Sequence, residues 1–217
     1  MDQSQGKQGN TLPDEFGSDQ TFNVLSRFKH NIFVQTYAST GKDEHGNFAW
    51  SRKMGSSEAL HFPYVKANGP RGLTYLPFDF DRPVSPDDFI RAKVPLPNMI
   101  IRDPVTGKAH ALYELDKTIY TKKSTDTRPG EALPVRYYNH VRDVMTRALG
   151  ADPAYRGSLT KNPLHSKWEA FVLTDHRCTL GELSEHLDLT TQHRKPTNTI
   201  PLERLTRVSV SIPYSNT

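Results

Sequence analysis

The stretch from Tyr75 to Asp81, with the sequence YLPFDFD, constrains the fold more than any other segment of this 217-residue chain. Apolar and acidic side chains alternate in it with a period of two, which is the pattern of a β-strand. One face of this strand carries three apolar side chains, Leu76, Phe78 and Phe80. The other face carries Asp79 and Asp81. The chain must therefore fold with one face of this strand in a core and the other at a polar site.

Two carboxylates side by side at the end of an apolar strand repel each other and cost free energy unless they are paired. Mg²⁺ and Mn²⁺ prefer carboxylate oxygens and keep waters and phosphates as their other ligands. An acidic pair of this kind is typical of two-metal nucleotidyl transfer. The alternative is a strand that leaves the core, with Asp79 and Asp81 on a solvated surface beside Arg82. The DFD pattern alone does not choose between the two.

Composition sets wider bounds. Hydrophobic residues make up 35% of the chain, and the net charge of +4 is compatible with a polyanionic partner. No run of residues approaches the ~20 apolar residues of a membrane span. Residues 1–20 lack the features of a signal peptide and are expected to form a disordered polar tail. Cys178 is the only cysteine, which excludes an internal disulfide and favours a cytoplasmic protein.

The patterns along the chain predict an α+β fold with a mostly antiparallel sheet flanked by helices. Strands are expected at residues 31–37, within 60–69, at 76–81, in a hairpin of 98–102 and 109–115, and at 204–212. Helices are expected at residues 86–92, 131–149 and 180–187. Three local signals support the helices: Ser85 as N-cap, Gly150 as C-cap, and Thr179 with Glu182 as a capping box.

Pro77 interrupts the acidic strand. Proline has no backbone N–H to donate, so it is confined to edge strands and bulges. The strand is therefore expected either at the edge of its sheet or bulged.

Further candidate residues lie outside this strand. His110 is on the second hairpin strand, where it shares a face with Glu114 and, if the strand continues, Asp116. Asp152 follows the long helix, and residues 160–165 form a loop rich in hydrogen-bond donors. Carboxylates can hold metals, and histidine or lysine can contact phosphate oxygens. Each residue also has an ordinary structural interpretation as a buried histidine, a helix cap or a turn.

Taken together, residues 60–81, 96–115 and 149–189 resemble the replicase (Rep) family. This family comprises plasmid and phage replication initiators whose catalytic domain belongs to the archaeo-eukaryotic primase superfamily. The stretch GADPAYRGSLTKNPLH, residues 150–165, makes the resemblance specific, because it is long and unusual in composition.

The resemblance implies an RNA-recognition-like antiparallel sheet and a DNA-dependent primase. Such an enzyme makes short primers from nucleoside triphosphates on a single-stranded DNA template, with Mg²⁺ or Mn²⁺, in the cytoplasm of a bacterial host. Residues 21–190 would form the catalytic domain, and residues 191–217 an extension of uncertain structure. Family members usually continue into an origin-binding region. Residues after 189 match nothing there, so binding of plasmid or phage origin DNA stays open.

The resemblance also implies roles for single residues. The first superfamily motif matches Asp79 and Asp81, and the second is met imperfectly at His110, because Lys108 stands where a small residue is usual. The third motif, a further acidic residue, is placed at Asp152. Glu114 and Asp116 are its rivals.

Under this assignment Asp79, Asp81 and Asp152 hold two metals, and His110 hydrogen-bonds the incoming triphosphate. Lys161 and Asn162 match the family's KNP segment and are candidates for phosphate or sugar contacts. Arg156 would add positive charge.

Two other functions fit parts of the sequence. One is a non-catalytic DNA-binding initiator that keeps the primase fold. The other is a metal-dependent nuclease that uses the same aspartates. A rolling-circle nickase fits less well, because it needs two histidines flanking one hydrophobic residue, and His110 has no such partner nearby.

Overall fold

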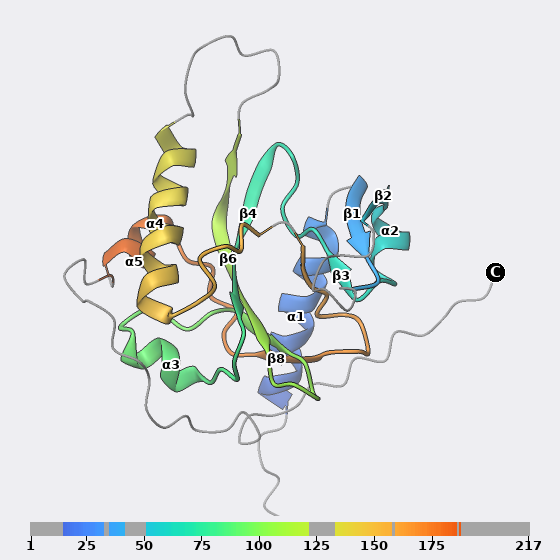
Figure 1. Cartoon of the computed structure of the whole chain (residues 1–217), viewed down its shortest axis with the longest axis horizontal. Helices are drawn as coiled ribbons and strands as arrows, with labels where there is room; N and C mark the ends of the chain where they lie inside the picture. Colours follow the sequence, from blue (N-terminus) through green and yellow to red (C-terminus); the bar gives the residue numbers. More distant parts are fainter. Residues whose placement is uncertain are drawn as a thin grey trace, which may run out of the picture.

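The computed structural model describes residues 15–32, 35–41, 51–121, 133–157, 159–185 and 187. Within them the chain forms two four-stranded sheets whose paired strands are all antiparallel, together with five helices. Figure 1 shows the arrangement. The fold is of the α+β class, as the sequence predicts.

The larger sheet contains the acidic strand at its edge. Its strand order is β4 (Gly72–Phe80), β6 (Ala109–Tyr120), β5 (Met99–Arg102) and β8 (Glu169–Val172). The smaller sheet has the order β2 (Arg52–Gly55), β1 (Gln35–Ser39), β3 (Tyr64–Val65) and β7 (Thr160–Lys161).

The two faces of the larger sheet are covered differently (Figure 1). One face packs against α3 (Pro86–Arg91), α4 (Leu133–Leu149) and α5 (Leu180–Glu185). The other packs against α1 (Glu15–Asn31) and the inner side of the smaller sheet, near the short helix α2 (Ser56–Ala59). The apolar face of β4 lies in the helix-covered core, where Leu76, Phe78 and Phe80 are at most 1% exposed.

Local signals in the sequence located several elements well. The hairpin of β5 and β6 turns where Asp103 accepts hydrogen bonds from the backbone of Val105 and Thr106, and Gly107 has a φ of 73°. Thr179 and Glu182 cap α5 through reciprocal hydrogen bonds. No helix among the described residues is long and apolar enough to cross a membrane.

The N-terminal part differs from the expectation. The polar tail was expected to reach residue 20, but α1 begins at Glu15, and the strand expected from residue 31 begins at Gln35. The helix forms because Val24, Phe28 and Ile32 recur at four-residue spacing and are buried against the larger sheet. Residues 1–14, residues 122–132 and the strand expected at 204–212 lie outside the described residues.

The edge position of β4 explains how the strand accommodates Pro77. The carbonyls of Tyr75 and Asp79 accept hydrogen bonds from outside the ladder, from Asn68 and the Asp152 N–H respectively. Because backbone groups alternate in direction along a strand, the nitrogen of Pro77 also faces away from β6. Its missing N–H therefore costs no ladder hydrogen bond, in agreement with the expected edge strand.

Asn68 holds a bulge near the other end of β4. The register between β4 and β6 shifts between Leu73 and Tyr75. The Asn68 side chain accepts hydrogen bonds from the backbone of Thr74 and Tyr75 and donates one to the carbonyl of Tyr75. The Tyr75 carbonyl also accepts a hydrogen bond from the Tyr138 hydroxyl, so the groups that depend on this one buried amide are the backbone N–H groups of Thr74 and Tyr75.

Replacing Asn68 by alanine should therefore lower the free energy of unfolding by about 2–4 kcal/mol, because it leaves these backbone groups unsatisfied. Urea denaturation measures this change. Ser57→Ala, at an exposed position in α2, is the control and should change stability by less than about 0.5 kcal/mol. Equal stability of the two variants would contradict the role given to Asn68.

Candidate active site

Asp79 and His110 are direct cross-strand partners in β4 and β6. The Nε2 atom of His110 lies 3.1 Å from Oδ1 of Asp79, and the two side chains are 5% and 14% exposed. The strand face that carries them continues with Leu112 and Glu114, as the alternation in the sequence predicts. The register of β4 and β6 therefore brings together residues 31 positions apart in the chain.

The other ring nitrogen of His110 is held by β7. The Thr160 hydroxyl lies 2.9 Å from Nδ1, and the backbone N–H of Lys161 donates to the same atom over 3.3 Å. Because a backbone N–H can only donate, Nδ1 must act as an acceptor. The neutral imidazole then carries its proton on Nε2, where it faces Asp79.

Tyr155 packs edge-on against the His110 ring, with the ring centroids 5.2 Å apart. Its hydroxyl donates to the carbonyl of Leu159 over 2.9 Å. Burial, followed by the charge of Asp79, raises the pKa of the Tyr155 hydroxyl far above its usual range. The Tyr155 side chain is thus uncharged at physiological pH and packs against the His110 ring.

Asp152 lies at the free edge of β4. Its backbone N–H donates to the carbonyl of Asp79 over 2.8 Å. Its own carboxylate accepts a hydrogen bond from the N–H of Ala154. A Cβ added to Gly157 would lie 2.9 Å from the Pro77 ring, so the same loop packs closely on the edge. The segment that follows α4 therefore brings a third carboxyl residue next to Asp79.

Asp81 lies just beyond the end of β4 and is mostly exposed. Its carboxylate accepts a hydrogen bond from Lys108 Nζ over 2.9 Å, and this bond together with the charge of Asp81 raises the pKa of Lys108. The charges of Asp79 and Asp103 act in the same direction. Lys108, which departs from the second superfamily motif, thus forms an ion pair with Asp81.

Lys161 is a buried lysine of β7, 5% exposed. Its ammonium group lies 5.6 Å from the centre of the Trp168 ring, which fits a cation–π contact. The pKa of Asp103 is lowered overall. Burial raises this pKa, whereas hydrogen bonds from Val105 and Thr106 and the charge of Lys161 lower it. Lys161 therefore places positive charge beside the acidic hairpin turn.

Asn162 and Arg156 differ in their surroundings. The Asn162 amide is fully buried and donates to the carbonyls of Leu60 and Phe62. Its oxygen accepts from the N–H of Leu164, so this side chain fixes the loop. Arg156 is mostly exposed and lies 3.4 Å from Asp143 of α4.

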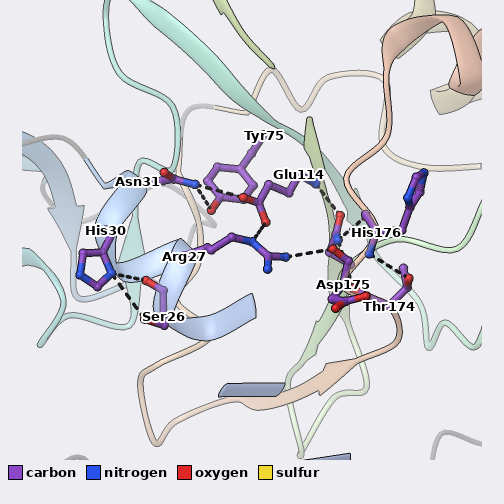
Figure 2. Close-up of polar contacts among 10 residues, drawn as sticks. Ser26, Arg27, His30, Asn31, Tyr75, Glu114, Thr174, Asp175 and His176 are labelled. Carbon is purple, nitrogen blue, oxygen red and sulfur yellow. Dashed lines mark hydrogen bonds and ion pairs between the residues drawn. The ribbon is translucent and has the colours of Figure 1, made fainter. Parts of the chain in front are cut away.

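Glu114, a rival for the third acidic position, has a different environment (Figure 2). It is 2% exposed, and its carboxylate accepts hydrogen bonds from Arg27 over 2.8 Å and from Asn31 over 3.3 Å. Both partners belong to α1, and Arg27 also donates to the carbonyl of Asp175. Glu114 thus anchors α1 to the sheet.

The position of Glu114 also separates it from the acidic group. It lies four residues along β6 from His110, which is about 13 Å of extended strand. Asp116 lies two residues farther in the same direction, where its N–H donates to the carbonyl of Cys178. Among the three rivals, Asp152 is the one bonded directly to Asp79.

Asp79, Asp81 and Asp152 are the expected metal ligands, and carboxylate oxygens are what Mg²⁺ and Mn²⁺ prefer. The contact between Asp152 and Asp79 is a hydrogen bond between backbone atoms. Asp81 is balanced by Lys108 and is accessible to solvent. Within the described part of the chain, no three acidic, histidine or cysteine side chains are close enough to form a complete protein-only site. A cation here would therefore rely on water or phosphate for its remaining ligands, as Mg²⁺ usually does.

Sequence reasoning missed four contributors to this site: Thr160, Tyr155, Lys108 as an ion-pair partner, and Asp103. Tyr155 and Thr160 lie inside the GADPAYRGSLTKNPLH stretch, which was singled out as a whole. Lys108 was noted only as a departure from a motif. A search for charged side chains two residues from each motif position, which share its face of the strand, would have found Lys108.

Comparisons with known proteins identify the family and the fold of the chain. The model of the Replicase family matches residues 34–187. Among solved structures, the chain is similar to the AEP (archaeo-eukaryotic primase) domain of the primase-polymerase PrimPol from cyanophage S-2L. The TM-score is 0.54 and the sequence identity 13%, over 78% of this chain and 97% of that one. No curated protein matches. The expected resemblance and the primase-like fold are thereby confirmed.

The orientation of His110 is testable without an activity assay. Thr160→Val should increase the population of the tautomer protonated on Nδ1, because it removes one of the two donors to that atom. Nitrogen NMR of the imidazole ring measures the population. Thr160→Ser keeps the hydroxyl and should behave like the wild type. The same tautomer population in Thr160→Val as in the wild type would show that Thr160 does not orient the ring.

Proposed function

The chain belongs to the Replicase family and has an archaeo-eukaryotic-primase-like fold, and from this premise we propose that it is a DNA-dependent primase. Its reaction would be the synthesis of short primers from nucleoside triphosphates on single-stranded DNA. The observation that supports this most strongly is the convergence of Asp79, His110 and Asp152 at the end of one edge strand. The place of action would be the cytoplasm of a bacterium in which plasmid or phage DNA is copied.

In this proposal Asp79, Asp81 and Asp152 hold the divalent cations. When bound, Mg²⁺ or Mn²⁺ lowers the pKa of the attacking 3′-hydroxyl and neutralises charge on the leaving pyrophosphate. Lys108, whose ammonium group lies 2.9 Å from Oδ1 of Asp81, would supply positive charge to a triphosphate bound beside Asp81. This role for Lys108 is not suggested by the sequence motif.

His110 contributes one N–H to the site. In the absence of substrate this N–H faces Asp79, where it fixes the orientation of the carboxylate. The same N–H would donate to an oxygen of the incoming triphosphate, in keeping with the position of the ring beside Asp79. Thr160 and the Lys161 backbone hold the ring in place throughout, because they bond to its other nitrogen.

The remaining candidates act at longer range. Lys161 supplies positive charge from a buried position, where electrostatic interactions are less screened than in water. Arg156 is exposed on the loop beside the site, where it would exchange its solvent-exposed contact with Asp143 for a bound phosphate. Asn162 positions the loop that carries Lys161, through its three hydrogen bonds to backbone groups.

Primer synthesis on primer-free single-stranded DNA is the direct test. Asp79→Asn and Asp81→Asn should each lower incorporation of labelled nucleoside triphosphates by at least about a hundredfold, because each removes a negative ligand of the cations. Glu185→Gln, at an exposed position in α5, is the matched control and should keep full activity.

The products of the wild-type protein separate this function from its alternatives. Short labelled primers support the primase. Degradation of the template that depends on Asp79 would identify a nuclease. Binding of DNA without incorporation or degradation would identify a non-catalytic initiator.

The third acidic residue is tested by comparing Asp152→Asn with Glu114→Gln. Asp152→Asn should weaken Mn²⁺ binding, measured by calorimetry, with little change in stability. Glu114→Gln should leave Mn²⁺ binding unchanged but lower the free energy of unfolding by about 1–3 kcal/mol, because Arg27 loses its buried partner. The opposite pattern would assign the third ligand to Glu114.

A further inference from the structure

The outer face of the smaller sheet carries lysines and aromatic rings in alternation. The strand register places Tyr37 opposite Lys53, and it places Tyr64 between Ser39 and Lys161. The inner face of the same strands, with Ala38, Met54 and Val65, is buried in the core. Tyr37, Lys53 and Tyr64 therefore lie on the opposite face of the sheet from Ala38, Met54 and Val65, and Tyr64 is partly buried there against Trp168.

Lysine ammonium groups lie over the rings on this face. Lys66 Nζ is 5.9 Å from the centre of the Tyr37 ring, and Lys167 Nζ is 4.8 Å from that of Trp168. Tyr64 packs edge-on against Trp168, with the centroids 5.2 Å apart. Tyr37 is 43% exposed, while Lys53 and Lys167 are also exposed. We name the group of Tyr37, Lys53, Tyr64, Lys66 and Lys167 the lysine–aromatic face.

The charged side chains of the four strands in the smaller sheet are all basic. The four strands of the smaller sheet, QTYAS, RKMG, YV and TK, contain no acidic residue. The pKa of Tyr64 is raised to about 12, first by burial and then by the charges of Asp103 and Asp79. Strand β7 connects the two regions, because Lys161 is the register partner of Tyr64 and the neighbouring Thr160 hydroxyl lies 2.9 Å from Nδ1 of His110. The lysine–aromatic face therefore adjoins the candidate active site.

We propose that the lysine–aromatic face binds single-stranded DNA and leads it toward Asp79. Lysines would contact phosphates, and exposed rings would stack on bases, which is the combination found in surfaces that bind single strands without sequence preference. A duplex hides the faces of its bases and cannot use the rings. The inference rests on the proposed function only for the identity of the strand as a template.

Binding of a labelled oligothymidylate of about twelve nucleotides tests the lysines, with fluorescence anisotropy at several salt concentrations and without nucleotides or divalent cations. For Lys53→Ala combined with Lys66→Ala, the slope of log affinity against log salt concentration should fall by about 0.7 per lysine. The control combines Arg136→Ala with Arg147→Ala, which removes the same charge from exposed positions on α4. The control slope should equal that of the wild type.

The rings are tested at high salt, where stacking contributes most of the affinity. Tyr37→Leu should weaken binding about tenfold, whereas Tyr37→Phe should retain it, since stacking requires only the ring. Thermal melting verifies that both variants are folded. Unchanged binding in the double lysine variant and in Tyr37→Leu would overturn the proposal, and so would tighter binding to duplex DNA or to RNA of the same sequence.

The test is independent of catalysis. A protein that binds the oligonucleotide through this face but makes no primers would refute the proposed function and leave this surface assigned. A protein that makes primers while its lysine variant binds the oligonucleotide normally would support the proposed function and refute the assignment of this surface.

Discussion

The pairing of β4 with β6 is the constraint on which the rest of the molecule depends. Because side chains alternate along a strand, a slip of one residue would turn Phe78 toward the polar site and Asp79 into the helix-covered core. Burial of an unpaired carboxylate makes that alternative very unfavourable. Asn68 fixes the register from the far end of β4, where it satisfies the bulge. The position of Asp79 opposite His110 is thus determined by packing and hydrogen bonding well outside the site.

One segment both covers the free edge of β4 and builds the site. Exposed strand edges pair readily with other chains, so proteins cover or interrupt them. Here Pro77 offers no N–H, Gly157 packs on its ring, and Asp152 bonds to the carbonyl of Asp79. The same segment continues to Thr160, which orients His110. The same segment therefore protects the edge of β4 and positions residues of the candidate active site.

Features that depend on a few neighbouring residues were predictable from the sequence, whereas those set by distant contacts were not. The alternation in YLPFDFD predicted both faces of β4, and turn and capping residues located the hairpin and α5. The proximity of Asp152 to Asp79 followed only from the family resemblance. Helix α1 was missed because its apolar residues are sparse among polar ones, and a two-residue strand such as β7 has no periodicity to detect. The pairing of Lys108 with Asp81 likewise depends on a register that no local pattern specifies.

The anchoring of α1 has a consequence for where the folding unit ends. Arg27 and Asn31 precede residue 34, whereas their partner Glu114 lies inside the segment that the Replicase model matches. A chain trimmed to that segment would retain every matched residue, but the buried carboxylate of Glu114 would lose its ion-pair partner Arg27. The loss of one partner of a buried ion pair is strongly destabilising. An apolar side chain of similar volume at position 114 would remove that penalty. The folding unit therefore extends beyond the segment defined by family likeness, since the Arg27 ion pair, the Asn31 hydrogen bonds and the buried apolar side chains of α1 all cross that boundary.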